Sequence, residues 1–164
     1  LEKESIKINN ILFVCGTMWT NFNNNDPLEM LKIARYMTDF KRIVVDNGIF
    51  SPYDAYKDHN IFMNFVKEEL AKPEHDKVVI VTHHCPSMKC VPLEYSEDNR
   101  VNHGYISNYD CFILQNPKIT HWICGHSHNK LDTMIGNTNI IMNCRGYFPQ
   151  EKIAHDFDLK YIEV

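Results

Sequence analysis

The sequence predicts an α/β domain in which two packed sheets are flanked by helices. Short apolar, β-branched runs at 78–82 and 119–124 are typical of buried strands. Apolar residues with roughly helical spacing at 28–37 and 61–70 predict two amphipathic helices ahead of the first run. Strands and helices follow each other in a mixed order over 164 residues, a length that suits a single domain.

The remaining elements are predicted from turn residues and capping residues. Further strands are expected at 6–8, 11–16, 131–135, 138–142 and 159–164. Helices should begin at Asp26-Pro27 and Ser51-Pro52, because Asp and Ser accept from free backbone N–H groups and Pro fits the first helical turn. A third helix is expected at 105–115, and loops are expected at 21–25 and 83–102.

Composition excludes some classes of function. The net charge of -4 and the pI of about 6.1 do not indicate a nucleic-acid or membrane surface. No apolar run approaches the roughly 20 residues that a membrane span needs. The cysteines do not form a small disulfide scaffold, so we expect a reduced, cytoplasmic protein. Cys85 and Cys90 lack the Cys-x-x-Cys spacing of a zinc knuckle, so a thiol metal site there is the less favoured interpretation.

Each of the two buried strand runs ends directly in histidines. His83 and His84 follow the first run, and Gly125, His126 and His128 follow the second. Imidazole is the commonest protein ligand for borderline divalent metals, and the glycine permits the sharp turn that would aim two side chains inward. The other interpretation is that such histidines are incidental in a chain that has nine. Four more are expected at the surface, namely His59, His75, His121 and His155.

Four stretches resemble a known family. VTHHCPS at 81–87 and GHSH at 125–128 are similar to the last two metal motifs of the calcineurin-like metallophosphoesterases. GTMWTNF at 16–22 and NCRGY at 143–147 resemble the GTLWTDF and NPRGY stretches of a bacterial and phage branch of that family. The departures from those motifs are Met18 for Leu, Asn21 for Asp, Cys85 for Ala, Ser127 for Thr and Cys144 for Pro, and none removes a metal ligand.

The resemblance implies a four-layer α-β-β-α sandwich with two divalent metal ions, of which Mn, Fe, Zn and Ni suit the ligand types. It implies that His83 and His126 bind one ion and that His128 binds the other. It leaves His84, whose equivalent varies in the family, as the less favoured ligand.

Three further residues are candidate substrate contacts. The guanidinium of Arg145 matches phosphate oxygens, although a structural salt bridge is the favoured interpretation of this residue. Asn102 and His103 end the long loop and could reach a substrate.

The first three motifs of the family are Asp-x-His, Gly-Asp and Gly-Asn-His-Asp/Glu, and this sequence contains none of them. Residues 1–164 are therefore expected to be the C-terminal portion of a metallophosphoesterase domain, with the catalytic histidine in a separate N-terminal segment of the same polypeptide. Three neutral imidazoles cannot offset the repulsion between two dications about 3.5–4 Å apart, so the chain alone is expected to be inactive.

The expected function is hydrolysis of a phosphoric monoester or diester in a small phosphorylated substrate. One alternative is an interaction scaffold with the same fold and a degenerate metal site. A further alternative is a mononuclear, histidine-rich metal-binding domain unrelated to the family.

Overall fold

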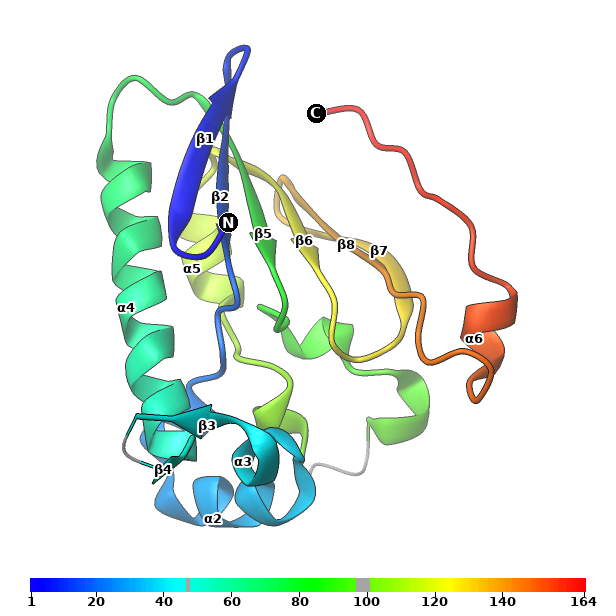
Figure 1. Cartoon of the computed structure of the whole chain (residues 1–164). Helices are drawn as coiled ribbons and strands as arrows, with labels where there is room; N and C mark the ends of the chain where they lie inside the picture. Colours follow the sequence, from blue (N-terminus) through cyan, green and yellow to red (C-terminus); the bar gives the residue numbers. More distant parts are fainter. Residues whose placement is uncertain (47, 97–100) are drawn as a thin grey trace.

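The computed structural model describes residues 1–46, 48–96 and 101–164, and its architecture is α/β. A six-stranded mixed sheet has the order β1-β2-β5-β6-β8-β7 (Figure 1). Its strands, in that order, are Glu4–Ile8, Ile11–Gly16, Lys77–Thr82, Ile119–Cys124, Thr138–Asn143 and Lys130–Ile135. The strands β2, β5, β6 and β8 are parallel, and the edge strands β1 and β7 pair antiparallel to their neighbours. The carboxyl ends of the parallel strands therefore meet at one edge of the sheet.

The helices are short except for α2 and α4. They are α1 Phe22–Asn25, α2 Pro27–Tyr36, α3 Asp39–Arg42, α4 Pro52–Ala71, α5 Asp110–Gln115 and α6 Lys152–His155. The strands β3 Val44–Val45 and β4 Gly48–Ile49 form a separate ladder, and 3₁₀ turns occupy Met88–Cys90 (η1), Leu93–Tyr95 (η2) and Asn102–Gly104 (η3).

The two long helices begin where the capping residues predicted. The Asp26 carboxylate accepts from the backbone N–H groups of Leu28 and Glu29, at 2.8 and 3.4 Å. Ser51 and Asp54 form a reciprocal capping box at the start of α4. Within the described part of the chain, no helix is both long and apolar enough to cross a membrane.

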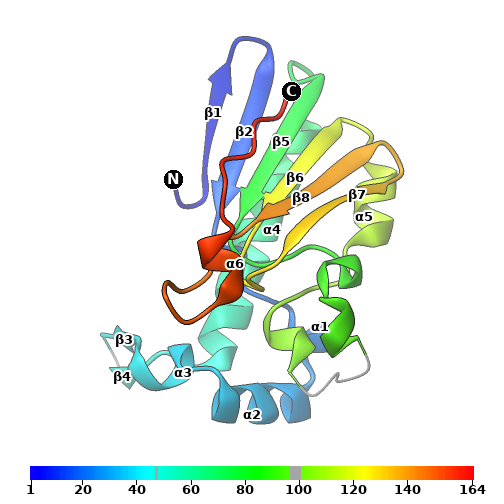
Figure 2. The ribbon, with the colours of Figure 1, turned by 90° about the vertical axis from the view of Figure 1, so that its right-hand side faces the viewer.

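One face of the sheet packs against α4 and α5 (Figure 1). A continuous buried cluster joins side chains of these helices to side chains of the strands, among them Phe62, Val66, Ile113, Val14, Ile80 and Trp122. The chain beyond α6 runs extended across the opposite face (Figure 2). There the Asn143 side-chain amide donates to the Asp158 carbonyl at 2.9 Å.

A second, smaller core lies beyond the carboxyl ends of the parallel strands. It consists of Phe22, Ile33, Met37, Phe40 and Ala55, which come from α1, α2, the α2–α3 region and the start of α4. This core holds α2 and α3 opposite the strand ends (Figure 1), so that side chains of the two parts can face each other.

Several predicted elements differ from the structure. The described residues form one large sheet and the short β3–β4 ladder, so the expected pair of packed sheets is not seen among them. The predicted strand at 159–164 is wrong, because this segment is extended but pairs with no strand in the part of the chain that the structure describes (Figure 2). The predicted third helix begins at Asp110 rather than at Tyr105, because Tyr105 and Ser107 exchange backbone hydrogen bonds with Cys85 instead of entering a helix.

Three more predictions differ from the structure. The asparagine-rich stretch is a left-handed turn rather than an irregular loop, with φ of 53° at Asn23 and 60° at Asn24, a conformation that Asn tolerates better than most residues. His59 and His75 are buried rather than exposed. The His59 ring faces the backbone oxygen of Trp19 at 3.0 Å and the Tyr109 hydroxyl at 2.6 Å, so its polar atoms are satisfied inside the fold.

Candidate metal centre

The pairing of β5 with β6 brings the first two predicted ligands together. These strands are parallel neighbours, so the segments that follow them leave the sheet side by side. The Gly125 N–H donates to the His83 carbonyl at 3.0 Å, which ties the two segments to each other. As a result, His83 Nε2 and His126 Nδ1 lie 2.8 Å apart.

The turn that carries His126 and His128 has unusual backbone geometry. His126 has a φ of 66° and His128 a φ of 44°, and both values lie in the left-handed region that non-glycine residues rarely adopt. The Ser127 N–H donates to the Gly125 carbonyl at 2.8 Å and closes the turn. Strain of this kind is concentrated at functional sites, where the surrounding structure holds side chains in a required direction.

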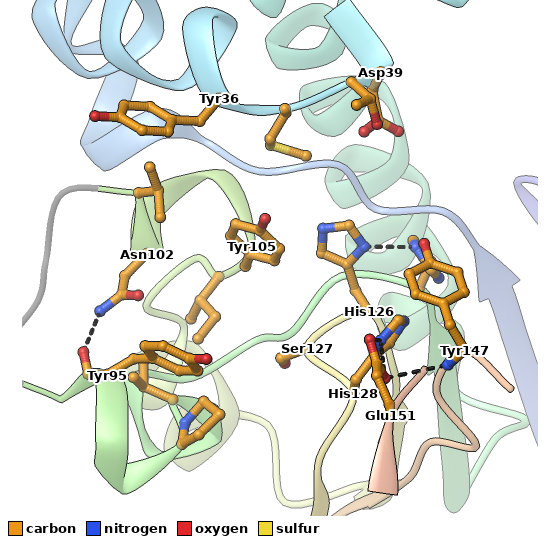
Figure 3. Close-up of a pocket in the computed structure, with 17 residues that line it drawn as sticks. Tyr36, Asp39, Tyr95, Asn102, Tyr105, His126, Ser127, His128, Tyr147 and Glu151 are labelled. Carbon is orange, nitrogen blue, oxygen red and sulfur yellow. Dashed lines mark hydrogen bonds and ion pairs between the residues drawn. The ribbon is translucent and has the colours of Figure 1, made fainter. Parts of the chain in front are cut away.

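His128 faces a carboxylate rather than the other two histidines. Its Nδ1–H donates to both oxygens of Glu151, at 2.8 and 3.0 Å (Figure 3). Glu151 also accepts from the Tyr147 backbone N–H at 3.2 Å, and the hydrogen bond from His128 lowers the pKa of Glu151. In the neutral imidazole with Nδ1 as the donor, Nε2 carries the lone pair, which is the arrangement found where a carboxylate orients a metal-binding imidazole.

His84 lies beneath the His83–His126 pair and is 1% exposed. Its ring centroid is 4.4 Å from that of His126 and 5.0 Å from that of Trp19, and its backbone N–H donates to the Thr17 carbonyl. Burial holds the pKa of His84 well below its usual value. His84 therefore forms part of the buried wall under the pair.

The neutral forms of His83 and His126 are favoured. Burial lowers the pKa of His126 to about 3, and it lowers the pKa of His83 as well. Metal ligation requires a neutral imidazole, so both rings are in the competent state at neutral pH.

The geometry of this pair fits one metal ion after a small movement. Two imidazoles on a tetrahedral ion at about 2.0–2.1 Å place their nitrogens about 3.3 Å apart. The observed separation is 2.8 Å, so a shift of roughly half an ångström would admit the ion. His126 Nε2 is also buried and lacks a hydrogen-bond partner among the described residues. However, the ligand atoms of the three predicted histidines do not form one group. Across residues 1–46, 48–96 and 101–164, the group of possible ligands whose atoms all lie within 4.8 Å of one another consists of three cysteines, Cys85, Cys90 and Cys124.

A cavity of about 760 Å³ separates these histidines from α2 and α3 (Figure 3). His83, His126 and His128 line it from the strand side, and its acidic lining consists of Asp39 and Glu151. The cavity is large enough for a small-molecule ligand.

The three predicted substrate contacts lie in different places. Asn102 lines the cavity, and its side-chain amide donates to the Tyr95 carbonyl at 3.1 Å. His103 is not among the residues that line it. Arg145 is exposed and lines a separate, more open hollow with Tyr147 and Phe148.

Several residues of this site could not be found from the sequence pattern. Glu151 is 23 positions from His128 and belongs to none of the recognised stretches. Tyr105, whose ring centroid is 4.5 Å from that of His126, and Asp39 come from segments with no metal-binding signature. Tyr147 is the last residue of the NCRGY stretch, and its ring meets the His128 ring edge-on at 4.6 Å. That stretch was therefore the available signal for this part of the site.

In comparisons with known proteins, no protein family, curated protein or solved structure matches this chain.

Proposed function

We propose that this chain carries the imidazole part of the metal centre of a phosphoric ester hydrolase of the calcineurin-like metallophosphoesterase type. The observation that carries the proposal is the His83–His126 pair, 2.8 Å apart at the ends of neighbouring parallel strands on the wall of a cavity. The hydrogen bond by which Glu151 orients the His128 ring is a second, independent observation in favour of the metal centre.

In this proposal His83 and His126 hold one divalent ion and His128 holds a second. Mn, Fe, Zn or Ni at these positions would neutralise phosphoryl charge and lower the pKa of a bound water. Among the described residues, the ligand atoms of His83, His126 and His128 do not all lie within 4.8 Å of one another, which favours two ion positions over one.

The other residues of the cavity have supporting roles. Glu151 keeps the His128 ring in one tautomer and orientation. His84 and Tyr105 pack against the His126 ring and hold it in a partly desolvated, neutral state. The Asn102 side chain lines the cavity, and its amide can orient a small phosphorylated substrate.

We place a further layer of the fold on the sheet face opposite α4. Phe13, Val81 and Ile123 point to this face and are only partly buried. Val79 and Ile141 on the same face are 0% and 3% exposed, and the extended chain beyond α6 crosses it (Figure 2). The apolar side chains that stay partly exposed beside the C-terminal segment favour a further layer, as in a four-layer α-β-β-α sandwich. We assign that layer to an N-terminal segment of the same polypeptide.

The same segment would supply the carboxylate ligands. Asp39 and Glu151 are the carboxylates on the cavity wall, and Glu151 is already engaged by His128. Two dications a few ångströms apart require an anionic bridge, which neutral imidazoles cannot provide. Residues 1–164 alone are therefore expected to bind a divalent ion weakly and to hydrolyse no phosphoester.

Hydrolysis of p-nitrophenyl phosphate and bis-p-nitrophenyl phosphate with Mn²⁺ tests the proposal on the natural polypeptide that contains these residues. We expect His126→Ala to lower turnover by more than about 100-fold, because a direct ligand matters more than the residues that orient it. His155→Ala is the matched control, since His155 is exposed, its ring faces the Pro149 carbonyl at 3.0 Å and it lies outside the cavity lining. A folded polypeptide that binds no Mn²⁺ and hydrolyses neither ester would rule out the enzyme and favour the scaffold.

A further inference from the structure

Three cysteine side chains from separate segments meet beneath the histidine turns. Cys85 follows β5, Cys90 closes η1 and Cys124 ends β6. Their sulfur atoms all lie within 4.8 Å of one another. Cys85 and Cys90 are 0% exposed and Cys124 is 6% exposed, so the cluster is shielded from solvent.

The surroundings of these thiols are rich in sulfur. Met142 on β8 places its Sδ 3.5 Å from Cys85 Sγ. The nearby oxygen atoms are the Gly125 carbonyl, which accepts from Cys85 at 3.1 Å, and the Ser127 hydroxyl at 3.3 Å. Thiolate and thioether ligands select soft or borderline ions such as Cu(I) and Zn(II) over Mg²⁺, Ca²⁺ or Mn²⁺.

The spacing of the thiols is close to that of a real metal site. Ligands at about 2.3 Å from a tetrahedral ion have sulfur atoms about 3.8 Å apart. Thiols within 4.8 Å of one another would therefore need to close by no more than about 1 Å. Buried cysteines often act simply as small apolar groups, but that role does not require three thiols and a thioether from four segments to converge on one point.

We propose that Cys85, Cys90 and Cys124 form a buried site for a single thiophilic d¹⁰ cation, Zn(II) or Cu(I), beside the thioether of Met142. Such an ion would join the loop after β5, the η1 turn and the end of β6. Cys85 lies two residues after His83, and Cys124 lies two residues before His126. The ion would thus hold in place the two turns that carry these histidines, and the site stands whether or not the proposed hydrolase function is correct.

Metal content after reconstitution tests this site. The reduced, metal-free chain is loaded anaerobically with Zn(II) or with Cu(I) in separate arms, passed through gel filtration and analysed by mass spectrometry for bound metal. A His83→Ala/His126→Ala background removes the imidazole pair from the measurement. In that background we expect about one ion per chain in at least one arm, loss of the ion in Cys124→Ala, and its retention in Cys111→Ala, whose parent thiol is exposed.

A second measurement keeps the test decisive if Cys124→Ala misfolds. Cys90→Ala then replaces it, and circular dichroism confirms that the compared variants are folded. Co(II) bound in place of Zn(II) should show a sulfur-to-cobalt charge-transfer band that disappears in the same variants. The proposal is overturned if the histidine-deficient chain retains no ion in either arm, or if Cys124→Ala and Cys90→Ala retain it unchanged. It is also overturned if thiol counts on the unfolded chain, taken before any reduction, show two of these cysteines joined in a disulfide.

Discussion

The hydrogen bond between His128 and Glu151 gives the sharpest test of the histidine site. Both carboxylate oxygens accept from His128 Nδ1, at 2.8 and 3.0 Å, and the pair lines the cavity. Replacing Glu151 with Ala removes this acceptor and leaves the ring free to change tautomer or rotate. Glu151→Gln keeps one oxygen acceptor but loses the negative charge and the second contact.

The size of the effect follows from the role of such carboxylates. Loss of a group that orients a metal-binding imidazole weakens metal affinity by about 10- to 100-fold. Glu151→Ala should show this full effect. Glu151→Gln should show a smaller one, because a neutral amide oxygen can still accept from Nδ1–H.

The assay is nuclear magnetic resonance of the histidine ring nitrogens with and without Mn²⁺. The wild-type chain should show His128 as the Nδ1–H tautomer, and Mn²⁺ should broaden its signals at a concentration that rises about 10- to 100-fold in Glu151→Ala. Glu68→Gln, on an exposed part of α4, is the matched control for a lost surface charge. If Glu151→Ala leaves both the tautomer and the Mn²⁺ dependence unchanged, Glu151 does not orient His128 for a metal.

Three further predictions concern stability, measured by urea unfolding. Phe62→Ala should lower the free energy of unfolding by about 3–5 kcal/mol, because Phe62 is 0% exposed. The neighbouring control Ile61→Ala should change it by no more than about 0.5 kcal/mol, because Ile61 is 57% exposed. Equal losses in the two variants would contradict the packing of α4. Ser51→Ala should cost about 1 kcal/mol through loss of the α4 cap, and no loss would mean that the capping box does not stabilise the helix. Burial lowers the pKa of His59, so below about pH 6.5 the unfolded chain takes up a proton that the folded chain does not. The free energy of unfolding of the wild type should therefore fall between pH 7 and pH 5, and His59 contributes up to about 1.4 kcal/mol per pH unit to this fall. His59→Gln should remove that part of the pH dependence, and the control His155→Gln should leave it unchanged.

Local chemistry explains why most of the secondary structure could be predicted. The strand β6 was predicted at its observed bounds, because an apolar, β-branched run allows few other structures. The starts of α2 and α4 were predicted because Asp26 and Ser51 act on backbone groups only a few positions away. The final strand was predicted wrongly, since an extended apolar segment becomes a strand only if a partner edge is in reach, and that depends on the rest of the fold.

The histidine pair was predicted only in part. The sequence alone placed His83 and His126 at the ends of two buried strands. Whether their rings would meet depended on β5 and β6 being parallel neighbours, which is a property of the sheet order. The partner of His128 was beyond the pattern altogether, because Glu151 reaches it only through the path of the chain after β8.

The three clustered cysteines show most clearly the difference between what the sequence predicts and what the tertiary structure decides. From the sequence, Cys85 and Cys90 lacked the spacing of a thiol metal site, and Cys124 stood 34 positions after Cys90 with no visible relation to either. The sequence by itself determined the central strands, the starts of the two long helices and which strand ends carry imidazoles, because these depend on short-range hydrogen bonding and apolar periodicity. Only the tertiary structure decided which side chains share a cavity or a core, because the sheet order and the packing of α4 set those distances, and neither is encoded within any one segment.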